Sequence, residues 1–65
     1  MTHARLAIDI GGTFTDFAIE AGEQHYSLKV LTTPRAPEEG VLAGIEQILA
    51  HARLTPPDIG IIIHG

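Results

Sequence analysis

The apolar residues of this chain change their spacing once, and that change constrains the fold more than any other feature. Three segments alternate between apolar and polar residues, at 6–10, 14–20 and 24–31. A period of two is typical of strands with one buried face. Two short turns that contain glycine, Gly11-Gly12 and the turn around Gly22, separate these segments. We therefore predict an antiparallel meander of three strands.

From residue 37 onward the spacing becomes helical. Pro37 suits the first position of a helix, and Glu38 and Glu39 interact favourably with the positive end of the helix dipole. An apolar stripe follows, and Thr55 with the two prolines after it ends the helix. The predicted stripe consists of Val41, Leu42, Ile45, Ile48, Leu49 and Ala52.

The last segment, residues 59–63, is apolar on both faces and predicts a central strand that is covered on both sides. A helix that crosses back to such a strand implies parallel pairing with the first strand. The predicted fold class is therefore α/β, a β-β-β-α-β unit with a mixed sheet. Because 65 residues do not supply the neighbours that this strand needs, we expect the chain at 1–65 to be truncated after it.

Composition excludes several classes of function. Four Lys and Arg stand against eight Asp and Glu, a net charge of −4 that disfavours a nucleic-acid partner. The chain has no cysteine, so neither disulfides nor a thiolate metal site is indicated. No apolar run is long enough to span a bilayer, and the N-terminus lacks a hydrophobic signal core. We expect a soluble, cytoplasmic protein.

The first turn, within the stretch IDIGGTFTDF at residues 8–17, carries polar groups that a plain hairpin does not need. Gly11 and Gly12 lack a Cβ atom, so their backbone can approach an anion and point N–H groups at it. The hydroxyls of Thr13 and Thr15 can donate to phosphate oxygens. Asp9, at the end of the first strand, is placed to hold Mg²⁺ through water.

Two familiar phosphate loops are excluded, because the dinucleotide fingerprint and the P-loop both open a helix and the P-loop also needs a lysine. Here the turn leads into a strand and no lysine follows it. The residues alone leave a second explanation equally open, namely an ordinary hairpin turn with Asp9 and Asp16 as its polar flanks.

The pattern Asp-x-Gly-Gly-Thr-x-x-Asp, which begins at Asp9, resembles the phosphate-binding loop of the sugar kinase, heat-shock chaperone and actin ATPase superfamily. That superfamily has an RNase H-like fold. The blocks KVLTTP at 29–34, PEEGVLAGI at 37–45 and HG at 64–65 extend the likeness to nearly the whole chain. Together they resemble the start of hydantoinase A/5-oxoprolinase proteins, in which a Thr-Thr pair and several hundred residues follow.

This resemblance implies an ATP-dependent amidohydrolase that opens a cyclic amide such as a hydantoin or 5-oxoproline. ATP and Mg²⁺ would be the cofactors, and the partners would be the rest of the polypeptide and a second, B-type subunit. Asp9 would hold the metal and act in catalysis through it, and the phosphate ligands would be Gly11, Gly12, Thr13 and Thr15. Asp16 and His64 are further candidates, His64 because it ends a strand where α/β sheets place ligand contacts.

Three alternatives stay open. An ATP-dependent ketone carboxylase subunit of the same family shares this loop, and nothing before Gly65 separates the two activities. A sugar or acyl kinase fits the loop but not its surroundings. An α/β fragment without activity of its own is the third. We assign no chemistry to Lys29, expected to be a solubilising surface residue, or to the segment 32–34, expected to orient the helix.

Overall fold

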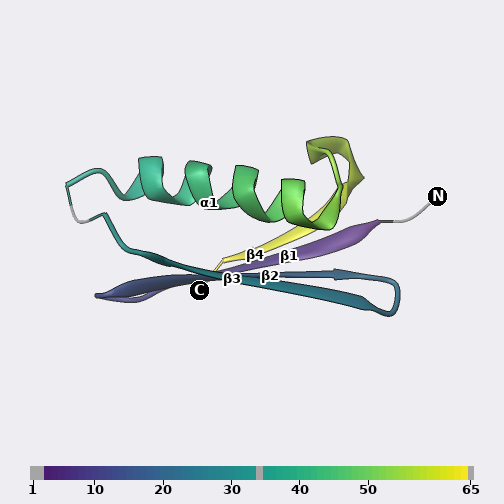
Figure 1. The fold of residues 1–65 in the computed structure, drawn as a ribbon, viewed down its shortest axis with the longest axis horizontal. Coiled ribbons are helices and arrows are strands. Elements are labelled where there is room, and N and C mark those ends of the chain that lie inside the picture. Colours follow the sequence, from purple (N-terminus) through teal and green to yellow (C-terminus); the bar gives the residue numbers. More distant parts are fainter. Residues whose placement is uncertain (1–2, 34, 65) are drawn as a thin grey trace.

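A computed structural model describes residues 3–33 and 35–64. The strands and the helix follow the predicted order: β1 (Ala4–Ile10), β2 (Phe14–Ala21), β3 (Gln24–Leu31), α1 (Pro37–Ala52) and β4 (Ile59–His64). A 3₁₀ turn that was not predicted, η1 (Pro56–Asp58), precedes β4. Figure 1 shows that α1 runs lengthwise along one side of the sheet. In these ranges, no helix is long and apolar enough to cross a membrane.

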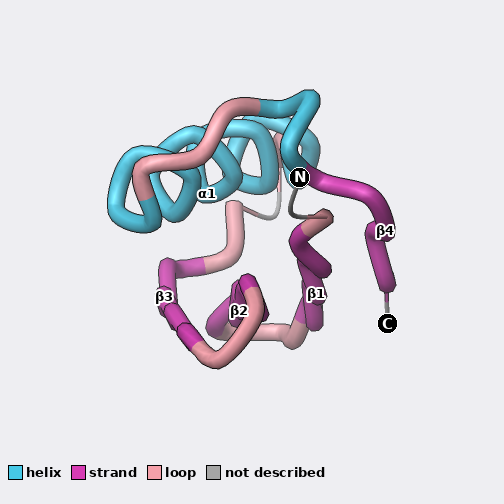
Figure 2. Tube along the Cα trace, turned by 90° about the vertical axis from the view of Figure 1, so that its right-hand side faces the viewer, coloured by secondary structure: helices cyan, strands magenta, loops and turns pink. Residues whose placement is uncertain are grey.

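The four strands form one mixed sheet in the order β3-β2-β1-β4. β2 pairs antiparallel with both β1 and β3, whereas β4 pairs parallel with β1. The end-on view of Figure 2 shows the helix above one face of this sheet, with β4 at its border. The predicted fold class and pairing directions are confirmed.

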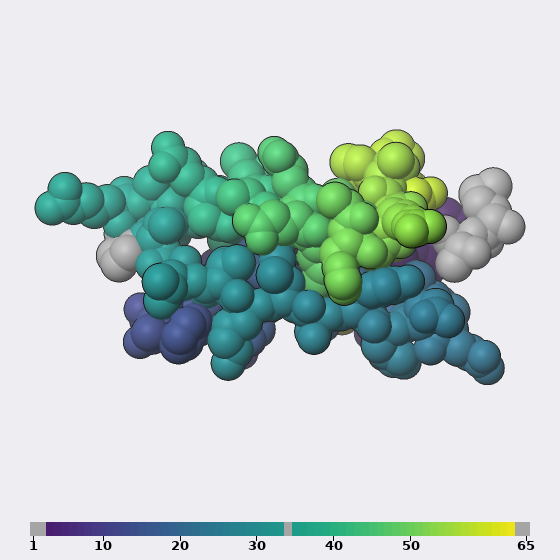
Figure 3. All heavy atoms as spheres, viewed as in Figure 1, coloured from purple at the N-terminus to yellow at the C-terminus, as the bar shows by residue number. Residues whose placement is uncertain are grey.

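Alternation along the strands builds the core on the helix side. Leu6, Ile8, Phe17 and Ile19 are all buried, and each lies on the same face as the others because successive strand residues point to opposite faces. The space-filling view of Figure 3 shows α1, in teal to green, lying directly on the strand layer. The helix contributes Ile48, fully buried, as its central core residue.

The helix comes close to the sheet at Gly44, which the apolar pattern does not identify. A Cβ atom at this position would overlap the ring of Phe17, which is itself only 1% exposed. The predicted stripe is wrong at Leu42, which is 60% exposed. Two residues turn an α-helix by about 200°, so a face centred on Gly44 and Ile48 leaves Leu42 on the opposite side.

The helix begins and ends with recognisable local signals. Pro37 is in the first turn, together with Glu38 and Glu39. The helix ends at Ala52, ahead of the predicted stop, because Arg53 adopts the left-handed conformation (φ 60°) and its N–H donates to the Ala50 carbonyl.

The 3₁₀ turn after the helix has a cap of its own. The Asp58 carboxylate accepts hydrogen bonds from the N–H and the hydroxyl of Thr55, at 2.8 and 3.0 Å. The backbone hydrogen bond and then the hydroxyl contact favour the charged carboxylate, so they lower the pKa of Asp58 below its ordinary value.

The prediction of a covered central position for β4 is wrong for the described residues. β4 pairs with β1 and forms the border of the sheet. The helix packs mainly over β2 and β3, and of the described β4 residues Ile59 is the one that packs against the core. Ile61, Ile62 and Ile63 are consequently 53%, 62% and 44% exposed.

Candidate phosphate-binding site

The polar turn lies at one end of the sheet, at the left in Figure 1, where several chain segments meet. It joins the end of β1 to the start of β2. Since β1, β3 and β4 run in the same direction, their C-terminal ends lie at this same edge. Thr32 therefore follows β3 beside the turn, and the backbone of His64 reaches the level of Ile8 at the end of β4.

Gly11 closes the turn. Its N–H donates to the Phe14 carbonyl oxygen at 2.9 Å, and a Cβ atom at Gly11 would lie only 2.9 Å from that same oxygen. A side chain here would thus force the turn apart. The N–H that we predicted would face phosphate is engaged inside the turn, so the geometry explains Gly11 as a structural glycine.

The fold gives no such reason for a glycine at position 12. A Cβ atom placed on it would meet nothing within 4 Å. Among the described glycines the positive φ belongs to Gly22, so the Gly12 backbone is one that other residues adopt. Gly12 and the neighbouring Thr13 are both exposed. An exposed glycine that neither packing nor conformation requires is what close approach of a bulky anion to the backbone would need.

Thr15 and Thr32 support the turn from the helix side of the sheet. Thr15 is 3% exposed, and its hydroxyl lies 2.9 Å from the Thr32 hydroxyl. The Thr32 hydroxyl donates to the Gly11 carbonyl at 2.8 Å, so the Thr15 hydroxyl is the donor of the pair. The Thr32 N–H donates to the Thr13 carbonyl, also at 2.8 Å. The predicted phosphate role of Thr15 would require this buried hydroxyl to leave Thr32.

Two carboxylates stand beside the turn on the opposite, uncovered face. Asp9 on β1 is directly across from Asp16 on β2, and both are exposed. Asp16 is in turn across from Lys29, whose Nζ lies 3.7 Å from Asp16 Oδ1 and 5.2 Å from the centroid of the Phe14 ring. Lys29 is thus exposed as predicted, and it also neutralises part of the charge of the acidic pair.

These residues fit a hydrated Mg²⁺. That ion keeps several waters and binds proteins through one or two carboxylates together with phosphate oxygens. A hollow of about 240 Å³ lies beside the pair and is lined in part by Ala7, Asp9, Asp16, Ala18 and Ile63. In the ranges 3–33 and 35–64, no group of three His, Cys, Asp or Glu forms a complete metal site.

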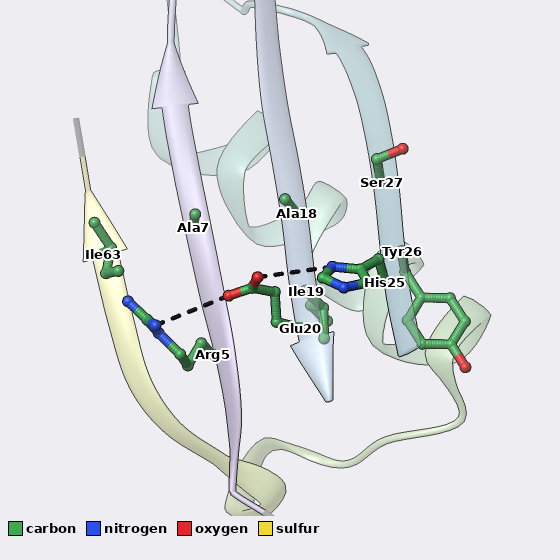
Figure 4. A pocket seen from close by; sticks show the side chains of 9 residues that line it. All are labelled: Arg5, Ala7, Ala18, Ile19, Glu20, His25, Tyr26, Ser27 and Ile63. Atoms are coloured by element: carbon green, nitrogen blue, oxygen red, sulfur yellow. Dashed lines mark ion pairs between the residues drawn. The ribbon is translucent and has the colours of Figure 1, made fainter. Parts of the chain in front are cut away.

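A larger hollow of about 290 Å³ lies farther along the same face, away from the turn. Figure 4 shows its polar side, where Glu20 lies between Arg5 and His25 at 3.9 and 3.7 Å. Its floor is made of the small residues Ala7 and Ala18. None of the predicted phosphate ligands lines either hollow, but the smaller one is lined by the carboxylates Asp9 and Asp16, which flank the turn.

Comparison with known proteins identifies the family. The sequence profile of the hydantoinase/oxoprolinase N-terminal region matches residues 5–65. An uncharacterized protein of Methanocaldococcus jannaschii is 40% identical over 63 residues, which cover 94% of this chain and 9% of that protein. The chain thus spans about a tenth of the length of this relative. The chain belongs to the hydantoinase/oxoprolinase N-terminal region family.

Proposed function

We propose that the turn at residues 11–13 binds the phosphates of ATP·Mg²⁺ in an ATP-dependent amidohydrolase that opens a cyclic amide of the hydantoin or 5-oxoproline type. Membership of the hydantoinase/oxoprolinase family supports the reaction class. The observation that carries the proposal is Gly12, an exposed glycine next to two carboxylates for which the fold itself gives no reason.

The hydrogen bonds of the turn support a division of roles among its residues. The Gly12 N–H and the Thr13 hydroxyl contact phosphate oxygens, whereas Gly11 and Thr15 hold the turn in shape. Asp9 would hold the waters of Mg²⁺, and Asp16, which lies across from it, would be a second acceptor. His64, whose strand ends at the same edge, stays a candidate for the rim of the site.

ATP would make the amide carbon, which is a poor electrophile, reactive toward water. Transfer of the γ-phosphoryl group to the amide oxygen would break its bond to ADP and leave a carbon that water can attack. The C–N bond then breaks, the nitrogen takes up a proton, and the product is an acyl phosphate. A second water hydrolyses this acyl phosphate to the carboxylate and inorganic phosphate. Catalysis of such a transfer depends on positioning and on neutralising charge. The remaining groups would come from the rest of the polypeptide and from a B-type subunit.

Replacing Asp9 tests this proposal in the complete protein. Asp9→Asn keeps the shape of the side chain but removes the charge that holds the metal. We expect ATP turnover at saturating Mg²⁺ to fall by about 10²-fold or more, the scale of losing a preorganised electrostatic contact. The affinity for ATP should fall far less, since the Gly12 N–H and Thr13 remain.

Glu20→Gln is the matched control, because Glu20 is an exposed carboxylate on the same face of the sheet but at its other end. We expect its turnover to stay within about twofold of the unmodified protein, in line with surface substitutions away from a site. Unchanged turnover in Asp9→Asn would show that Asp9 has no part in the mechanism and would favour the explanation of the turn as an ordinary hairpin.

A further inference from the structure

We propose that Thr32, which lies outside the glycine turn in the sequence, is a positioning residue that orients the Gly12 N–H of the turn toward phosphate. This inference rests on the proposed function and deepens it. Thr32 follows the end of β3, far along the chain from the turn, and its neighbour Thr33 points its own hydroxyl elsewhere, to the Ala36 carbonyl at 2.7 Å.

Thr32 makes three hydrogen bonds, two to the turn and one to Thr15 at the start of β2. Its hydroxyl donates to the Gly11 carbonyl, its N–H donates to the Thr13 carbonyl, and its hydroxyl oxygen accepts from the buried hydroxyl of Thr15. Two of the three contacts therefore depend on a single hydroxyl group. Thr15 restrains where that hydroxyl lies, because a buried hydroxyl is stabilised by keeping its hydrogen bond and this one is bonded to Thr32.

Because the peptide bond is planar, the contact between Thr32 and the Gly11 carbonyl also orients the Gly12 N–H. The carbonyl of Gly11 and the N–H of Gly12 belong to the same trans peptide unit and point in opposite directions. Because the Thr32 hydroxyl holds the Gly11 carbonyl, the Gly12 N–H must point away from Thr32. Thr32 contacts Thr15, which is on the helix-covered side, so the Gly12 N–H is directed to the side that carries Asp9 and Asp16.

The absence of a packing constraint at Gly12 makes this contact necessary. Nothing lies within 4 Å of a Cβ atom built at Gly12, so neighbouring side chains do not hold the peptide in place. Without the Thr32 hydroxyl, the Gly11–Gly12 peptide could rotate and its N–H would no longer converge on the same phosphate. Loss of alignment in a preorganised donor weakens binding and transition-state stabilisation together.

Three variants of the complete protein separate this role from ordinary stability. Thr32→Val has nearly the same shape but lacks the hydroxyl, and Thr32→Ser restores it. Thr33→Val is the control, since it removes a hydroxyl bond from the same connector without touching the turn. Affinity for ATP·Mg²⁺ is measured by isothermal titration calorimetry, KM and kcat by ATP hydrolysis, and thermal stability by circular dichroism.

We expect Thr32→Val to weaken ATP·Mg²⁺ binding and to raise KM for ATP by about tenfold, a modest loss for a donor that is misaligned rather than removed. Thr32→Ser should restore both values to within about threefold, and Thr33→Val should leave them unchanged although it loses similar thermal stability. Equal affinities in Thr32→Val and Thr33→Val would overturn the role of Thr32 and leave the proposed function standing. No binding of ATP·Mg²⁺ by the unmodified protein would overturn the proposed function itself, and this inference with it.

Discussion

At the scale of single residues, the two adjacent glycines of the turn have different explanations. Gly11 is required by the fold, since a side chain there would collide with the Phe14 carbonyl oxygen that its own N–H contacts. Gly12 is required by nothing that the described residues show. The same dipeptide thus contains one glycine that builds the turn and one that, under the proposed function, leaves space for a phosphate.

This difference predicts how the turn responds to a single methyl group. Gly12→Ala should fold with unchanged or slightly higher stability, because alanine reduces the freedom of the unfolded chain and meets no neighbour in the folded one. The expected gain is about 0.4–1 kcal/mol. Thermal unfolding followed by circular dichroism measures it. A clear loss of stability would show that Gly12 is needed by the fold and would remove the argument for a ligand.

At the scale of the elements, the helix packs through one narrow strip. Gly44 lets α1 approach the ring of Phe17, and Ile48, one turn later, fills the space beside it. Ile45 packs against this core but is only partly buried, and Leu42 faces solvent. The energetic importance of the apolar helix residues should therefore follow their burial and not their hydrophobicity.

A graded series of alanine substitutions tests that order. Ile48→Ala should cost about 2–5 kcal/mol, as expected for a large aliphatic residue removed from a core. Ile45→Ala should cost less, and Leu42→Ala should stay within about 0.5 kcal/mol of the unmodified protein, as for most exposed positions. Denaturant titration of the three variants measures the differences. Equal losses at Leu42 and Ile48 would contradict the helix placement.

The spacing of apolar residues was sufficient to predict the elements and their pairing, because strand and helix periods differ and a single crossover fixes the parallel pair. It could not predict that Gly44 is central to the helix contact, since a glycine adds nothing to an apolar pattern. The segment 32–34 was expected to orient the helix, and the contact of Thr32 with the turn could not be predicted for another reason. Its contacts reach back 17 and 21 residues, to Thr15 and Gly11, and local sequence contains no sign of them.

At the scale of the whole molecule, β4 is an edge strand of the sheet and its exposed side chains are apolar. Ile61, Ile62 and Ile63 are exposed on a strand that pairs with β1. Open strand edges with apolar side chains recruit other chains. A core of this size also supplies no more than about 3–5 kcal/mol. Both features affect the behaviour of these 65 residues when they are expressed by themselves.

We expect the isolated 65-residue chain to be marginally stable or to self-associate. Sedimentation velocity over a range of concentrations should show species larger than the monomer, and Ile62→Lys should reduce them because a charge on an edge strand opposes pairing. A monomer at all concentrations, with a sharp cooperative unfolding transition at high temperature, would refute this expectation.

The most direct test of the central claim, that this turn binds the phosphates of ATP, is the affinity of Gly12→Ala for ATP·Mg²⁺ in the complete protein. Isothermal titration calorimetry compares it with the unmodified protein and with Glu23→Ala, a change in the exposed turn at the other end of the sheet. We predict that Gly12→Ala binds at least about tenfold more weakly with no loss of thermal stability, since its methyl group would occupy the space of a phosphate. Equal affinities in all three proteins would contradict the claim.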